Sequence, residues 1–126
     1  MKIIIRPFKA ETDSGLIYDS YPKGVFFGSI QPKEPMRKKE WMKAFFEQMK
    51  YQLATSEVHI ACTEDDPDTV LGYSIVNGDT LHFVYVKASH RNNGIGKLLT
   101  KGKYKFINKE NLTKIGEAIL KRRGEL

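Results

Sequence analysis

Four parts of the chain have the pattern of β-strands. Residues 57–63 alternate between apolar and polar positions, residues 81–86 have the pattern of a buried strand, and 1–6 and 69–76 are rich in β-branched and other apolar residues. An acidic turn at 64–68 and the turn Asn77-Gly78-Asp79 separate the last three segments. Short turns of this kind connect antiparallel strands, so the pattern predicts a meander of three strands and a more distant first strand.

A longer period marks the expected helices. Trp41, Phe45, Met49 and Leu53 recur every four residues, which predicts a helix over 37–56 with one broad apolar face.

A shorter helix is expected over 10–20, capped at Thr12 or Asp13, with Leu16 and Ile17 as its apolar positions. Residues 20–35 contain three prolines and two glycines, which is typical of a loop.

Glycines directly after the strand 81–86 predict an anion-binding turn. Gly94 and Gly96 open a run with helical spacing that is expected to end near Ile107. A turn at Asn108 and a second short helix to residue 126 are expected to follow. Free N–H groups at a helix start, with glycines beside them, suit a phosphate.

Two common phosphate-binding loops do not fit this stretch. A P-loop requires Ser or Thr after Gly96-Lys97, where Leu98 stands, and a dinucleotide loop requires a glycine where Leu99 stands.

A third pattern does fit. Val86, Ala88, Arg91, Gly94 and Gly96 follow the order V-x-[PA]-x-x-R-x-x-G-x-G. This order resembles the acetyl-CoA motif of the GCN5-related N-acetyltransferases (the GNAT family), R/Q-x-x-G-x-G/A.

Two weaker features extend the resemblance to about residues 2–107. The opening IRPFKAETD is similar to the I-R-x-x-x-x-x-D start of that family, and Gly72-Tyr73 matches a step common on its third strand.

The resemblance implies a single α/β domain of the α+β type over residues 1–126. Its mixed, mainly antiparallel sheet would be flanked by helices in the order β-α-α-β-β-β-α-α. The closing strands of the family, and the fourth helix that carries its tyrosine acid, are not visible in the sequence, so the chain resembles a short member truncated at the C-terminus. The sheet edge left open is expected to be covered by 108–126 or by a second chain.

The function implied by the resemblance is acetyl transfer from acetyl-CoA to an amine, small molecule or protein, by direct transfer in a ternary complex. The strand would hold the pantetheine arm and the loop the pyrophosphate, through Val84, Tyr85, Val86, Arg91, Asn92, Asn93, Gly94, Ile95, Gly96 and Lys97. The loop 20–35 would line the acceptor side, with Tyr21, Phe26 and Phe27 as candidates.

The sequence leaves the proton-transfer groups open. Glu57, His59 and His82 lie on strands that face the cleft in this fold, and they are the candidate bases. Each histidine has an equally simple interpretation as a structural residue. Tyr73, Tyr85 or Tyr104 would have to replace the missing acid.

Charge suggests a nucleic-acid binder as one alternative to an active enzyme. Residues 81–126 contain eleven Lys and Arg against three Glu, a net charge of +8 within a chain of net charge +6. This basicity suits coenzyme A, and it would also suit nucleic acid, although no recognition signature accompanies it. The main alternative is a GNAT-like binding or regulatory protein, for example a viral one, that has lost catalysis.

Composition leads to the remaining expectations. With 40% hydrophobic and 29% charged residues, the chain is typical of a cytoplasmic globular protein. The apolar run at its start is too short for a signal peptide or a membrane span. The single cysteine and scattered histidines predict no metal site.

Overall fold

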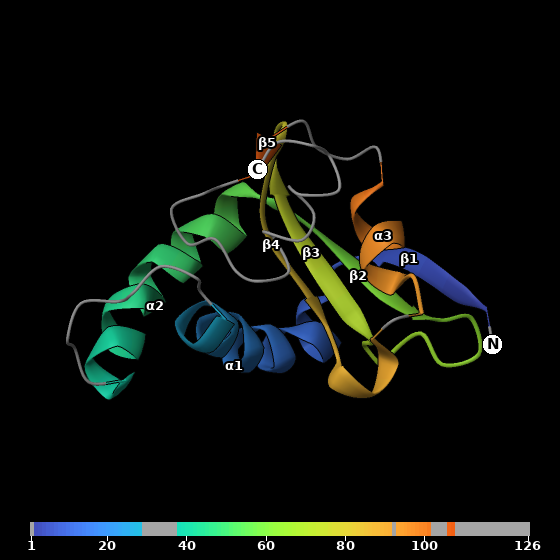
Figure 1. Cartoon of the computed structure of the whole chain (residues 1–126), viewed down its shortest axis with the longest axis horizontal. Helices are drawn as coiled ribbons and strands as arrows, with labels where there is room; N and C mark the ends of the chain where they lie inside the picture. The colour runs from blue at the N-terminus through green and yellow to red at the C-terminus, as the bar shows by residue number, and fades with distance from the viewer. Residues whose placement is uncertain (1, 29–37, 92, 102–105, 108–126) are drawn as a thin grey trace.

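The computed structural model describes residues 2–28, 38–91, 93–101 and 106–107. Five strands form one sheet in the order β1-β2-β3-β4-β5. The strands are β1 (Ile3–Pro7), β2 (Glu57–Thr63), β3 (Gly72–Asn77), β4 (Thr80–Val86) and β5 (Phe106–Ile107). The helices are α1 (Ala10–Gly28), α2 (Lys38–Thr55), the 3-10 turn η1 (Ala88–His90) and α3 (Ile95–Thr100). This architecture confirms the expected α+β class with its mainly antiparallel sheet (Figure 1).

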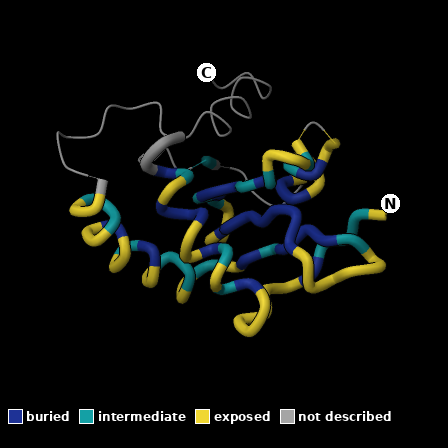
Figure 2. Tube along the Cα trace, turned by 90° about the horizontal axis from the view of Figure 1, so that it is seen from below, coloured by how far each residue is buried: buried dark blue, intermediate teal, exposed yellow. Residues whose placement is uncertain are grey.

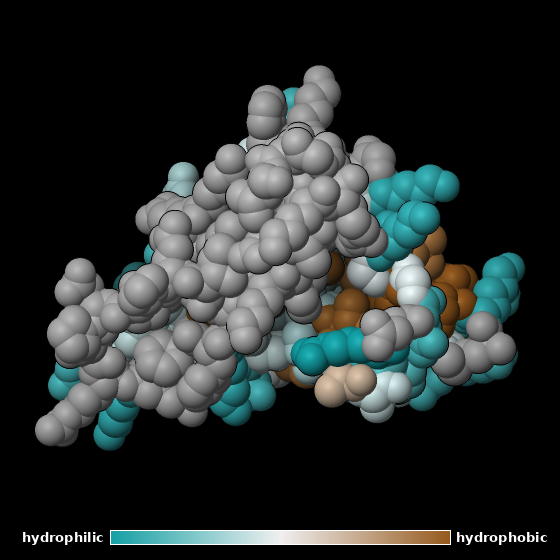
Figure 3. Space-filling view, in the orientation of Figure 1, coloured by the Kyte–Doolittle hydropathy of each residue, from teal (hydrophilic) through white to brown (hydrophobic). Residues whose placement is uncertain are grey.

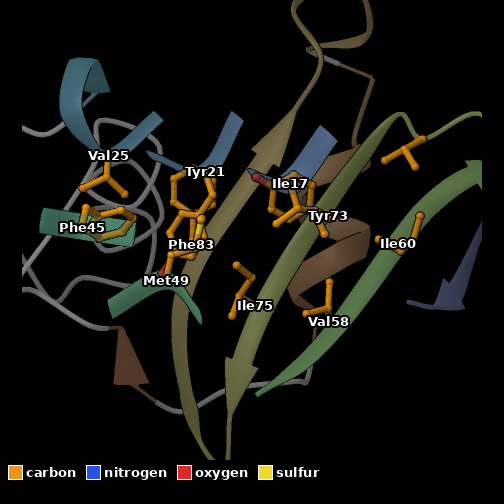
Figure 4. Packing of buried hydrophobic residues seen from close by; sticks show 11 residues of the cluster. Ile17, Tyr21, Val25, Phe45, Met49, Val58, Ile60, Tyr73, Ile75 and Phe83 are labelled. Atoms are coloured by element: carbon orange, nitrogen blue, oxygen red, sulfur yellow. The ribbon is translucent and has the colours of Figure 1, made fainter. Parts of the chain in front are cut away.

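Helices cover both faces of the sheet. On one face α1 and α2 contribute Ile17, Tyr21, Phe45 and Met49 to a core shared with β2, β3 and β4 (Figure 4). On the other face α3 packs Ile95 and Leu99 against the sheet. Buried positions concentrate in the strands and on the inward sides of the helices, while the outer sides are exposed (Figure 2). Burial of apolar area on two faces is the main source of stability.

Helix α1 corrects two expectations. It begins at Ala10, so Thr12 and Asp13 lie inside the helix rather than at its cap, and it continues through Pro22 to Gly28, where a loop was expected. The reason is the apolar stripe of Ile17, Tyr21 and Val25, each at most 3% exposed, which packs into the core and outweighs the local cost of a proline. Residues 29–37 of the expected loop lie outside the described residues.

The same burial removes Tyr21 from the acceptor side. Its ring is 3% exposed and stacks on Phe83 with ring centroids 4.7 Å apart. Phe26 and Phe27 belong to the last turn of α1. Tyr21 is therefore a core residue.

The end of the chain corrects a third expectation. Helix α3 ends at Thr100 rather than near Ile107, because Lys101 leaves the helical conformation at ψ 119°. Phe106 and Ile107 instead form β5, parallel to β4, opposite Thr80 and Leu81. The expected turn at Asn108 and the second helix lie outside the described residues, so the cover proposed for the sheet edge stays a prediction.

Two strand boundaries differ slightly from expectation. Strand β1 includes Pro7, which is tolerated because β1 is an edge strand. Strand β3 begins at Gly72 rather than at Thr69, although Leu71 already donates its N–H to the carbonyl of Ala61 at 2.8 Å. Elsewhere the strands and α2 match the expected ranges within two residues.

Gly72 provides a test of this packing. A Cβ atom added there would lie 2.5 Å from the carbonyl oxygen of Tyr85 and 3.2 Å from the Cα of Val86. Because both are backbone atoms, Gly72→Ala is expected to destabilise the fold by about 1–3 kcal/mol, measured by urea unfolding. Gly15→Ala is the matched control, since nothing lies within 4 Å of an added Cβ on that exposed helix position. It should leave stability unchanged or raise it by up to about 1 kcal/mol.

Candidate functional site

The predicted anion-binding turn forms between β4 and α3. Gly94 is the N-cap of α3, with φ 78° and ψ 8° in the left-handed region that favours glycine. Ile95 and Leu99 then fix the helix by packing against the sheet. Leu98 donates its N–H to the carbonyl of Gly94, so the N–H groups of residues 95–97 precede the first helical hydrogen bond.

Both glycines of the turn leave open space. A Cβ atom added at Gly94 would meet nothing within 4 Å, and one added at Gly96 would meet only Val86 Cγ2 at 3.8 Å. Gly94 is needed for its backbone conformation. Gly96 has no side chain, which leaves the backbone beside the end of β4 accessible. A ligand could approach the backbone closely at this point.

The outer edge of β4 lies beside this turn. Strand β5 pairs only with Thr80 and Leu81, and within the described residues no other strand lies beyond β4. Lys87 donates its N–H to Leu71, and hydrogen-bonded pairs alternate along an antiparallel ladder. Val84 and Val86 therefore direct their backbone groups outward, while those of Tyr85 point toward β3.

Basic side chains surround the turn. Arg91, Lys97 and Lys101 are exposed, and Lys87 is half-buried. Figure 3 shows polar side chains beside the apolar surface around α3, where Leu98 is 40% exposed. Of the residues expected to bind the cofactor, all except Asn92 are described, and they lie at the end of β4, in the turn after η1 and at the start of α3.

Two of the three candidate bases lie together, at a distance from this edge. His59 Nε2 and Glu57 Oε2 are 3.4 Å apart and line a cavity of about 660 Å³ with Ile5, Arg6, Pro7, Phe8 and Val58. His59 faces Ser74, which in turn faces Val84 across β3 and β4. Two inter-strand spacings, about 10 Å, therefore separate His59 from β4.

His82, the third candidate base, lies on β4 itself. The register moves from Ile75 opposite Phe83 to Val76 opposite Leu81, so His82 is the extra residue of a β-bulge. Burial lowers the pKa of His82 below its ordinary value of 6.5, because a buried site disfavours the charged imidazolium. A neutral imidazole is a proton acceptor at pH 7. No local pattern in residues 81–86 predicts this bulge.

The tyrosines differ in their access to the site. Tyr73 is fully buried, its hydroxyl lies 2.8 Å from Ser20 Oγ, and burial raises its pKa. Ser20 in turn donates to the carbonyl of Leu16 at 2.6 Å, so Tyr73 donates to Ser20. Tyr73 is therefore a structural residue. Tyr85 is half-buried at the end of β4, and Tyr104 lies outside the described residues.

Two negative findings concern the described part of the chain only. Its His, Cys, Asp and Glu side chains form no group of three that could hold a metal ion. None of its helices combines the length and apolarity needed to cross a membrane.

Comparison with known proteins identifies the architecture. No protein-family profile matches the sequence, and no curated protein has detectable sequence similarity to it. Among solved structures, a predicted acetyl transferase of Pyrococcus furiosus has a TM-score of 0.68 at 15% identity, covering 98% of this chain and 92% of that one.

Two further structures have the same arrangement. A GCN5-related N-acetyltransferase of Rhodopseudomonas palustris, described as an aminotransferase of class II, has a TM-score of 0.55 at 15% identity, covering 98% of this chain and 69% of that one. A predicted acetyltransferase with acetyl-CoA, from Clostridium acetobutylicum, has a TM-score of 0.55 at 14% identity, covering 97% and 88%. The chain therefore has the fold of the GCN5-related N-acetyltransferases, as the resemblance in its sequence implied.

Proposed function

We propose that the chain is an N-acetyltransferase that moves the acetyl group of acetyl-CoA directly to a primary amine in a ternary complex. The observation that carries the proposal is the outer edge of β4, which no strand of the described residues pairs with beyond Leu81, and which leads into a glycine turn at the start of α3. An extended polar arm that ends in phosphates is complementary to both parts. The likeness of the fold to a structure with acetyl-CoA supports the same ligand.

Each part of the cosubstrate has a proposed partner. The pantetheine amides pair with the outward backbone groups of Val84 and Val86, and the side chain of Tyr85 flanks them. The N–H groups of the turn and of the first residues of α3 hold the pyrophosphate. Lys97 adds positive charge at the start of α3. The residues proposed to contact the cosubstrate are Val84, Tyr85, Val86, Asn92, Asn93, Gly94, Ile95, Gly96 and Lys97. Arg91, the remaining residue of the motif, lies in the same turn.

The chemistry requires one bond to form and one to break. The neutral amine nitrogen attacks the thioester carbonyl, a C–N bond forms, the C–S bond breaks, and coenzyme A leaves as a thiolate. The N–H of Val86 is the proposed donor to the developing oxyanion. The amine gives up a proton to a base, and the thiolate takes one up, so the reaction is balanced without a further reactant.

We propose His82 as the base, because it is the candidate on β4. The rate is expected to rise with pH as its imidazole loses a proton, with a midpoint below pH 6.5, because burial lowers the pKa of His82. A pH–rate profile checks this, and His82→Gln should remove the rising limb of the profile. His59→Gln, a change two strands away, should keep it. Loss of the limb in His59→Gln alone would assign the base to the Glu57–His59 pair.

A GNAT-like binding protein without catalysis is the second candidate. One observation favours it: the hydroxyl of Tyr73 is hydrogen-bonded to Ser20, so among the candidate tyrosines of the described residues only the half-buried Tyr85 is left to protonate the thiolate. Without a tyrosine donor, a transferase can still use solvent water to protonate the thiolate.

Two measurements separate these functions. Calorimetric titration of the wild type with acetyl-CoA and with CoA is expected to give micromolar affinity, about −8 kcal/mol. Release of free thiol is then followed with a panel of small amines and lysine peptides. Binding with amine-dependent thiol release supports the transferase. Binding without release from any amine supports the inactive binding protein. No binding of either ligand rejects the transferase and favours a binding protein that has lost the CoA site.

A further inference from the structure

Arg91 makes a side-chain contact that its motif position does not reveal. Its Nε donates a hydrogen bond to the carbonyl oxygen of Val86 at 3.0 Å. Val86 is the last residue of β4, and Arg91 is the first residue after the η1 turn. The bond therefore connects the two ends of the segment between the strand and the glycine turn.

The acceptor of this bond, the Val86 carbonyl, does not pair with β3. The carbonyl of Val86 points to the outer edge of β4, because the neighbouring Lys87 N–H bonds Leu71 on β3 and the ladder alternates. Inside the segment, the N–H of His90 bonds the carbonyl of Lys87 at 2.9 Å, and the N–H of Arg91 reaches that of Ala88 at 3.4 Å. These bonds shape the turn itself, whereas the Arg91 side chain ties the turn to the edge of the strand.

We propose that Arg91 is a positioning residue, whose planar Nε–H donor, rather than its charge, holds the phosphate turn against the end of β4. The inference rests on the proposed function and concerns how the same site is held ready. With the tie in place, the amides that follow Gly94 and the outward groups of Val84 stay along one edge. A preformed site loses less conformational entropy when a ligand binds.

The chemistry of the side chain makes the proposal specific. In arginine and in glutamine, the fourth atom beyond Cα is a planar nitrogen that carries hydrogen, Nε or Nε2. In lysine the same place is a methylene carbon, and the ammonium lies one bond further, hydrated and without planar geometry. Glutamine at position 91 can therefore still donate a hydrogen bond to the Val86 carbonyl although it lacks the charge. Lysine keeps the charge but loses this hydrogen bond.

The test uses Arg91→Gln, Arg91→Lys and Arg91→Ala in the full chain. Calorimetric titration with CoA is expected to show Arg91→Gln within about threefold of the wild-type Kd, and Arg91→Lys and Arg91→Ala weaker by about tenfold, the size of one hydrogen bond. The opposite order, with lysine retained and glutamine lost, would overturn the proposal in favour of a charge contact with phosphate. Equal affinity in all three variants would also overturn it.

A second readout does not depend on CoA. In the free protein, 15N relaxation order parameters of Asn93 and Gly94 are expected to fall in Arg91→Lys and Arg91→Ala and to stay at the wild-type value in Arg91→Gln. Unchanged order parameters in all variants would overturn the inference. If the wild type binds no CoA while the order parameters follow the expected pattern, the tie exists and the proposed function fails alone.

Discussion

Asp13→Ala is expected to lower the free energy of unfolding by about 3–5 kcal/mol, the cost of leaving a buried charge without its partner. Both carboxylate oxygens of Asp13 accept hydrogen bonds from the Arg6 guanidinium at 2.8 Å, and the two side chains are 0% and 8% exposed. Arg6 also donates to the carbonyl of Pro67 at 2.8 Å, so the pair ties β1, α1 and the loop before β3 together. Chemical denaturation in urea measures the change.

Asp19→Ala is the matched control for a lost carboxylate. Asp19 pairs with Lys23 at 2.8 Å on the exposed side of α1, and this change should cost less than about 1 kcal/mol. A second variant with Arg6→Met and Asp13→Leu together should recover part of the loss, because it leaves no charge unpaired. Equal effects of Asp13→Ala and Asp19→Ala would contradict the structural role of the buried pair.

The Asp13 contribution is also expected to depend on pH. Burial by itself raises the pKa of Asp13, but hydrogen bonds from Arg6, the Lys9 amide and the Thr12 hydroxyl outweigh burial and hold it below its usual value. The stabilisation is therefore complete above about pH 4, the range of an unfolded aspartate. It is lost as the pH falls through the lower pKa of the folded protein. Asp13→Asn should remove this part of the acid sensitivity in thermal melts.

Gly96→Glu is expected to weaken CoA binding by at least about 100-fold. The new carboxylate would stand in the first turn of α3, beside the amides proposed for the pyrophosphate, where it would block and repel the ligand. Losing two charge-assisted hydrogen bonds costs about 3 kcal/mol or more. The fold should be retained, because an added Cβ meets only Val86 at 3.8 Å and an acidic residue is favourable at a helix start.

Gly96→Ala separates the ligand effect from the backbone effect. Its methyl group makes an ordinary contact with Val86, so binding should stay within about threefold of the wild type. Calorimetry with CoA on both variants, together with thermal melts, measures the difference. Unchanged affinity in Gly96→Glu would mean that the phosphates bind elsewhere. Gly94 is less suited to this test, because its φ of 78° strains any other side chain.

Local patterns were sufficient to predict most of this fold. Alternation predicted β2, a short run with the pattern of a buried strand predicted β4, and the four-residue spacing from Trp41 to Leu53 predicted α2. The glycine turn lies where the motif placed it. These features depend on neighbours in the chain, so the sequence contains them directly. Helix α1 extends past its expected end because the apolar stripe continues through Tyr21 and Val25, a local signal that Pro22 interrupts.

Long-range contacts account for what could not be predicted. Strand β5 has two residues and exists through its pairing with Thr80 and Leu81, a contact that no local pattern encodes. The bulge at His82 depends on the register between β3 and β4, and the bond from Arg91 to Val86 depends on the path of the turn. The separation of His59 from β4, in contrast, follows from the meander β2-β3-β4, which the turns in the sequence predicted.

The central claim is that acetyl-CoA lies along the outer edge of β4 and over the glycine turn. At 14.5 kDa the protein suits an amide 15N–1H NMR titration with CoA. The largest shifts are expected at Val84, Val86, Gly94 and Gly96, with small shifts at Glu57 and His59. Shifts confined to the cavity beside Glu57 and His59, or no shifts at millimolar CoA, would contradict the claim.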